Sequence, residues 1–223
     1  MIASKDGNTN IASILLEHGA RVDAQNKKNK RPALHFAAAN DRQDIAEMLI
    51  NYGASIDLPD EEGNTPLTCA ALDGNYTVAK MLVEQGASVD LANDRGWPSI
   101  MVASQCGHES VVEMLIVQVA KVDTCLPSCA TALHFACVGH HVDVAKLLID
   151  AGALIDCTDG EGNTLVHVAA YLGDTILLEL LRSIEQGWVD PLAFACAYDT
   201  WMKSNVFSKK VQSQWGCCHV VLE

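Results

Sequence analysis

Aromatic side chains, basic residues and long apolar runs are all scarce in this chain. Only 5% of the residues are aromatic although 49% are apolar, so a core has to be built mainly from Ala, Leu, Val and Ile. No apolar run approaches the roughly 18–20 residues of a membrane span. The first residues, MIASKDGNTN, lack the apolar segment of a secretory signal. We therefore predict no membrane insertion and a cytoplasmic protein, with the nucleus as the second compartment.

Basic residues are fewest in the middle of the chain. Between Asp44 and Asp190 there are 22 acidic and five basic residues, and the formal net charge is −13. Such a surface repels phosphate backbones, so we predict no nucleic-acid partner. The nine cysteines are odd in number and scattered, which does not fit a disulfide framework and agrees with an intracellular location.

Patterns of catalytic or metal-binding residues are incomplete. His108 begins a zinc-protease helix motif, but no second histidine follows at the required spacing. The cysteines at 125–137 and the CCH run at 217–219 could supply zinc ligands, yet neither group has a second pair at the spacing of a zinc site. The stretch GEGNT at 160–164 has two glycines without the rest of a dinucleotide- or phosphate-binding motif. We predict no enzymatic activity, no metal site and no cofactor.

One short phrase, in contrast, recurs at a fixed distance. Its Gly-Ala pair begins at Gly19, Gly53, Gly86 and Gly152, which gives steps of 34, 33 and 66, or twice 33. The remaining copy is expected at Val119, where valine replaces the glycine. Self-similarity at this period predicts stacked units that bury their apolar sides against one another. An aspartate closes every copy: Asp23, Asp57, Asp90, Asp123 and Asp156.

A single unit, residues 63–90, predicts two short helices and a turn. Thr65 is placed to cap the first helix, and Pro66 fits its first turn. Gly74 is expected to end this helix at positive φ. The apolar spacing of VAKML then predicts the second helix, which ends before Gly86.

The period of 33, the segments NTPLTCAALDGN and TALHFACVGHH, and the GASVD phrase together resemble ankyrin repeats over roughly residues 1–190. This resemblance implies an all-α solenoid of stacked helix–turn–helix units with projecting finger loops. It also implies that His35, His134 and His167 tie their turns together by hydrogen bonds. Thr68 and Met101 replace that histidine in two units.

The repeats predict three regions. Residues 1–25 form a truncated first repeat, and residues 191–223 form a degenerate repeat or cap with an irregular tail, for which partner binding is the alternative. Because the first unit lacks its finger, we expect a fragment with further repeats upstream; a frayed half-repeat that starts at Met1 is the alternative. Five repeats lie between, at 26–58, 59–91, 92–124, 125–157 and 158–190.

The resemblance implies a non-catalytic scaffold that binds a partner protein in a concave groove and on the finger loops. We expect a monomeric module. The alternatives are a regulatory or targeting region of a larger enzyme, channel or ubiquitin-ligase chain, and a secreted effector. Trp97 is the expected anchor, with packing against a neighbouring finger as its alternative role. The expected partner-binding residues are Trp97, Arg95, Asp60, Glu61, Glu62, Asn40, Leu72, Asp73, Gln105 and Tyr171.

Overall fold

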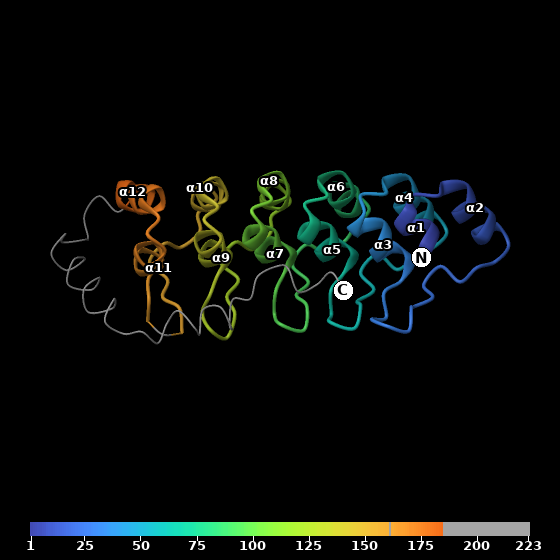
Figure 1. The fold of residues 1–223 in the computed structure, drawn as a ribbon, viewed down its shortest axis with the longest axis horizontal. Helices are drawn as coiled ribbons and strands as arrows, with labels where there is room; N and C mark the ends of the chain where they lie inside the picture. Colours follow the sequence, from blue (N-terminus) through green and yellow to red (C-terminus); the bar gives the residue numbers. More distant parts are fainter. Residues whose placement is uncertain (161, 185–223) are drawn as a thin grey trace.

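The computed structural model describes residues 1–160 and 162–184. These residues form twelve α-helices and no β-strand. The helices form two parallel rows, and loops project from the row of first helices (Figure 1). This is the all-α solenoid that the sequence predicted. The predicted cap and tail at 191–223 lie outside the described residues. The helices are α1 Ile2–Asp6, α2 Thr9–Glu17, α3 Ala33–Ala39, α4 Gln43–Asn51, α5 Pro66–Asp73, α6 Tyr76–Glu84, α7 Ser99–Cys106, α8 Glu109–Val117, α9 Ala132–Val138, α10 Val142–Asp150, α11 Leu165–Leu172 and α12 Thr175–Ile184.

The unit at 59–91 shows why these residues form a helix pair. The Thr65 side chain accepts a hydrogen bond from the N–H of Thr68 at 3.2 Å, and Pro66 is the first residue of α5. Gly74 ends α5 with φ of 70°, and Gly86 follows α6 with φ of 95°. The expected cap and turns of this unit are therefore confirmed. Across residues 1–160 and 162–184, no helix is long and apolar enough to cross a membrane.

Val119 keeps the backbone conformation of the glycine that it replaces. Its φ is 63°, close to the 81–95° of Gly19, Gly53, Gly86 and Gly152. A β-branched residue is strained in this region of φ. The repeat geometry therefore imposes the turn even where the residue disfavours it.

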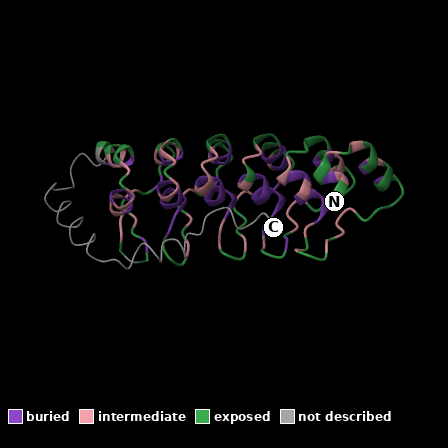
Figure 2. Cartoon of the chain, viewed as in Figure 1, coloured by how far each residue is buried: buried purple, intermediate pink, exposed green. Residues whose placement is uncertain are grey.

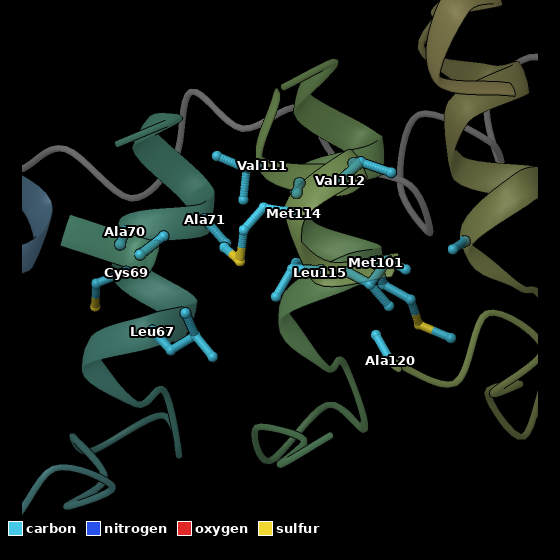
Figure 3. Packing of buried hydrophobic residues seen from close by; sticks show 14 of the residues in the cluster. Leu67, Cys69, Ala70, Ala71, Met101, Val111, Val112, Met114, Leu115 and Ala120 are labelled. Carbon is cyan, nitrogen blue, oxygen red and sulfur yellow. The ribbon is translucent and has the colours of Figure 1, made fainter. Parts of the chain in front are cut away.

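Small apolar residues form the contact surface between units. First helices pack on neighbouring first helices and second helices on second helices. Because an alanine side chain is short, the helix backbones can approach closely, and larger side chains fill the remaining space. Figure 3 shows Leu67, Met114 and Leu115 in the apolar layer between α5 and the pair α7–α8. One buried alanine recurs at the same position of five first helices: Ala37, Ala70, Ala103, Ala136 and Ala169.

The aspartate that closes each phrase links one unit to the next. Asp23 accepts hydrogen bonds from the N–H of Ser55 at 3.1 Å and from its hydroxyl at 2.6 Å. Asp57 accepts the same two bonds from Ser88 at the same distances. Sequence reasoning noted these aspartates without finding their role, although their spacing of 33 or 34 residues was a signal. The same link joins Asp90 to the N–H of Lys121 and Asp123 to that of Leu154.

Candidate partner-binding face

The fingers are the loops that precede the first helices, and a backbone hydrogen bond closes each of them. We number them as the first finger 26–31, the second 60–64, the third 93–97, the fourth 126–130 and the fifth 159–163, of which residue 161 is not described. The finger tips and the outer side of the second helices are exposed, while the facing sides of the helices are buried (Figure 2). The closing N–H to O=C bonds in the second to fourth fingers are Asp60 to Asn64 (2.9 Å), Asn93 to Trp97 (3.1 Å) and Leu126 to Ala130 (3.0 Å).

Backbone hydrogen bonds also join neighbouring fingers. The N–H of Glu61 donates to the carbonyl of Asn29, and the N–H of Asp94 donates to that of Glu62, both at 3.0 Å. Gly63 lies at the second of these contacts with φ of 78°. A Cβ added to it would lie 2.6 Å from the backbone nitrogen of Asp94. Glycine is therefore required there both by conformation and by close approach.

Asp60 stabilises the backbone of the fingers, and its side chain is not accessible to a partner. Its Oδ2 accepts a hydrogen bond from Nε of Arg31 at 2.9 Å, and its side chain is only 1% exposed. Its Oδ1 accepts the N–H groups of Glu62 and Asn64, both at 2.9 Å. A tight turn leaves backbone donors that need an acceptor, and the carboxylate satisfies two of them. The expectation that Asp60 binds a partner therefore does not fit its position.

The other charged residues expected at the finger tips are exposed. Glu61 lies 3.8 Å from Lys30 of the first finger, and both side chains remain largely exposed. Glu62 accepts a hydrogen bond from Nδ2 of Asn64 at 3.3 Å. Arg95 is exposed on the third finger. These three expected residues, Glu61, Glu62 and Arg95, are thus accessible to another molecule.

Trp97 combines a packing role with partial exposure. Its ring centroid lies 4.3 Å from that of Phe135 in α9, and the two ring planes are tilted by 51°. Trp97 is half-buried as a result. One part of the indole therefore joins the third finger to the next unit's first helix, and the rest stays accessible.

The expected residues on the first helices lie at or next to the C-terminal ends of these helices, in successive units of the array. Leu72, Gln105 and Tyr171 occupy equivalent positions, 33 or 66 residues apart, and all three are half-buried. Asn40 and Asp73 occupy the next position; Asn40 donates a hydrogen bond from Nδ2 to the carbonyl of Phe36 at 2.8 Å, and Asp73 is exposed. The helix ends therefore form a row along the array of units. We call the exposed finger tips and this row the finger face.

Two of the three expected turn histidines close their own turns. Nδ1 of His134 accepts the N–H of Thr131 at 3.3 Å, and Nδ1 of His167 accepts that of Thr164 at the same distance. Each histidine also lies within 3.0 Å of the hydroxyl oxygen of its threonine. These contacts hold the start of α9 and α11.

His35 makes a different contact because its turn lacks the threonine. Pro32 stands at that position and has neither a hydroxyl nor an N–H, and Nδ1 of His35 has no hydrogen-bond partner among the described residues. Nε2 instead donates to the carbonyl of Asn64 at 2.9 Å and joins α3 to the second finger. Burial lowers the pKa of His35 and also that of His134, so both are neutral at pH 7.

His35, Asp60 and Cys69 form a buried group whose potential ligand atoms lie within 4.8 Å of one another. The Asp60 carboxylate, however, is already paired with the Arg31 guanidinium. Burial raises the pKa of the Cys69 thiol to about 12, so the thiol stays protonated at neutral pH. A zinc ion bound here would have to displace the thiol proton of Cys69 and the Arg31 partner of Asp60. This chemistry favours a polar network that supports the fingers over a cation site.

Known proteins share these repeats over short segments. Protein glp-1 of Caenorhabditis elegans is 37% identical over 71 residues, which are 29% of this chain and 6% of that protein. E3 ubiquitin-protein ligase Ufd4 of Drosophila melanogaster is 43% identical over 65 residues, which are 29% of this chain and 2% of that protein. Putative ankyrin repeat protein FPV232 of Fowlpox virus is 36% identical over 59 residues, which are 26% of this chain and 12% of that protein.

These matches cover only a small part of each relative, from 2% to 12% of its length. A family model described as ankyrin repeats, in three copies, matches far more of this chain. Its matches fall on residues 1–60, 53–125 and 100–190, which together span most of the 223 residues. The chain therefore belongs to the ankyrin repeat family.

Proposed function

We propose that the chain is a non-catalytic scaffold that binds a partner polypeptide in a concave groove formed by the finger face. One observation carries this proposal: the hydrogen bonds that hold the fingers and link the units repeat from unit to unit, while partly exposed side chains change. The closing bonds of the fingers and the aspartate links recur. At one position of the first helices, in contrast, Leu72, Gln105, Val138 and Tyr171 follow one another. A constant frame with variable side chains is suited to recognition of a specific surface.

Charge on the finger face supports a partner with an uneven charge distribution. The first finger exposes Lys27 and Lys28, whereas the second exposes Glu61 and Glu62. The fourth finger, at 126–130, has no charged residue. A polypeptide with acidic residues over the first finger and basic residues over the second would match this order.

Site-specific photo-crosslinking tests the proposal. A benzoylphenylalanine at Leu72, at the end of α5, is expected to capture a polypeptide from a cell extract. The same group at Lys80, exposed on α6 of the same unit, is the matched control and is expected to capture little. Glu61→Lys together with Glu62→Lys should weaken the capture about tenfold or more, because both charges are reversed. Equal capture at positions 72 and 80, or capture at neither, would contradict the proposal.

A second function follows from the names of two relatives. Ufd4 of Drosophila melanogaster and hecd-1 of Caenorhabditis elegans are both E3 ubiquitin-protein ligases, and the matched segment is 2% of each. The repeats of this chain would then serve as a regulatory or targeting region of a larger enzyme, channel or ligase chain. Sequencing the full transcript tests this. A catalytic or channel domain in the same reading frame supports the second function, and a reading frame that encodes only repeats contradicts it.

We also propose that the scaffold is monomeric and works in the cytoplasm, with the nucleus as the second compartment. The many cysteines outside disulfides support a reducing compartment, and among the described residues there are six of them. Sedimentation velocity and imaging of the tagged chain test the two points. A dimer in the first measurement, or a secreted chain in the second, would contradict them.

A further inference from the structure

The first helix pair exposes side chains that every later pair buries. Ile11 and Leu15 of α2 are 49% and 51% exposed. Their counterparts in α4, 34 residues further on, are Ile45 and Leu49, which are 1% and 3% exposed. In the remaining second helices the counterparts are at most 2% exposed: Val78 and Leu82, Val111 and Leu115, Val144 and Leu148, Leu177 and Leu181.

Each later helix pair is covered by the pair that precedes it, and this accounts for the difference in exposure. Among the described helices, the pair α1–α2 packs on the pair that follows it, with α1 on α3 and α2 on α4, and it lies at the end of the array (Figure 1). In α12, at the other end of the described array, Leu177 and Leu181 are buried and α10 packs on the helix from the preceding side. The side that a preceding pair covers is therefore the side on which Ile11 and Leu15 lie.

The exposed side chains form one apolar face across both helices. Ile2 of α1 is exposed, whereas its counterparts in α5, α7, α9 and α11 are buried. Ile14 of α2 is exposed, whereas its counterparts in α6 and α8 are buried methionines. We call Ile2, Ile11, Ile14 and Leu15 the N-terminal face. Protein surfaces seldom expose large apolar groups together unless another molecule covers them.

We propose that the N-terminal face docks one further helix pair of the ankyrin type, stacked in the same register as the internal pairs. The residue types support this occupant, because Ile11 and Leu15 repeat the Ile/Val and Leu pattern of the stacked second helices. The face is thus the continuation of an interface that the molecule already uses between its units. A second copy of this chain, packed face to face, is the competing occupant.

A fusion within the full chain tests the proposal. Met1 is equivalent to Met101, so residues 59–100 placed directly ahead of Met1 supply a complete helix pair and two fingers in register. We expect amide hydrogen exchange in α2 to slow by about tenfold or more. We also expect Tm to rise by about 5 °C, since each added unit contributes an interface to a solenoid.

Glutamine substitutions provide the matched controls. Ile11→Gln with Leu15→Gln should change Tm by about 2 °C or less in the unfused chain, because both side chains are exposed there. In the fused chain the same pair should abolish the slower exchange in α2. Ile45→Gln with Leu49→Gln should lower Tm strongly in both chains, because these residues are already buried.

Two results would overturn the proposal. The first is unchanged exchange in α2 after the fusion. The second is a dimer of the unfused chain, seen by sedimentation velocity, that Ile11→Gln with Leu15→Gln converts to a monomer; this would assign the face to a second copy. A monomeric unfused chain together with slower α2 exchange in the fusion supports the proposal.

Discussion

The second and fourth fingers have the same turn but different chemistry. The N–H of Asp60 closes the second finger at 2.9 Å, and the N–H of Leu126 closes the fourth at 3.0 Å. Asp60 also binds two further N–H groups and Arg31, whereas Leu126 contributes an apolar, half-buried side chain. Cys129 occupies the position of Gly63 with φ of 59°.

This difference shows that the repeat geometry determines the shape of a finger. The polar anchor of the second finger stabilises the turn but is not needed to form it. Side chains on the fingers can therefore change from unit to unit without altering the frame, which is what a recognition surface requires. The four experiments that follow compare residues of the fingers and of the helices next to them, in order of decreasing effect.

Removing the polar anchor should have the largest effect. Asp60→Ala leaves the Arg31 guanidinium and two backbone N–H groups without their acceptor, and we expect a loss of about 3 kcal/mol in the free energy of unfolding. Leu126→Ala, the matched change in the fourth finger, removes a half-buried apolar side chain and should cost about 1 kcal/mol. Urea denaturation measures both losses. Equal losses would remove the distinction between the two fingers.

Gly63→Ala tests the close approach of the second and third fingers. Strain at φ of 78° and the clash with the Asp94 backbone should together cost about 2 kcal/mol. Gly162 is the control, because its φ is 84° but a Cβ there would meet no atom within 4 Å. We expect Gly162→Ala to cost about 1 kcal/mol, from backbone strain alone. A thermal scan that shows the same loss for both variants would rule out the clash.

Cys129→Gly should stabilise the fourth finger. Glycine adopts φ of 59° without strain, so we expect a gain of about 0.5–1 kcal/mol after the entropy of the unfolded chain is included. Cys125→Ser on the same loop is the control; Cys125 is exposed and has no positive φ, so little change is expected. If Cys129→Gly destabilises the chain in urea, its backbone is not strained.

The smallest effect concerns pH. Burial holds the pKa of His35 below its ordinary value, so below about pH 6.5 the unfolded chain binds a proton that the folded chain does not. The free energy of unfolding therefore decreases as the pH is lowered, by at most about 0.7 kcal/mol per histidine between pH 7 and pH 6. His35→Gln should flatten this dependence, and so should His134→Gln, because burial also lowers the pKa of His134. Two variants with the wild-type pH dependence would contradict both assignments.

The repeat period predicted much of the fold. Thr65, Pro66 and Gly74 gave the start and end of α5, because capping and left-handed turns depend on neighbouring residues. The position of the replaced glycine at Val119 was also predictable from spacing. Its retained positive φ was not, because a β-branched residue disfavours that conformation.

The candidate site was less predictable than the fold. An acidic residue in a loop, such as Asp60, resembles an exposed finger-tip residue in sequence. Its partner Arg31 lies 29 residues earlier, in the preceding finger, so the pair exists only after the units stack. Trp97 was expected to be either an anchor or a packing residue, and its contact with Phe135 of the next unit could not be found from local sequence. The absence of a turn partner for His35, in contrast, follows from Pro32 alone.

Hydrogen exchange with bound partner tests the central claim most directly. The polypeptide captured at position 72 would be added at saturation to the wild-type chain, and amide exchange would be compared with that of the free chain. We expect slower exchange in the second and third fingers and at the C-terminal ends of α5 and α7, with little change on the outer side of α6 and α8. Slower exchange confined to α6 and α8 would show that the partner binds the opposite side of the solenoid.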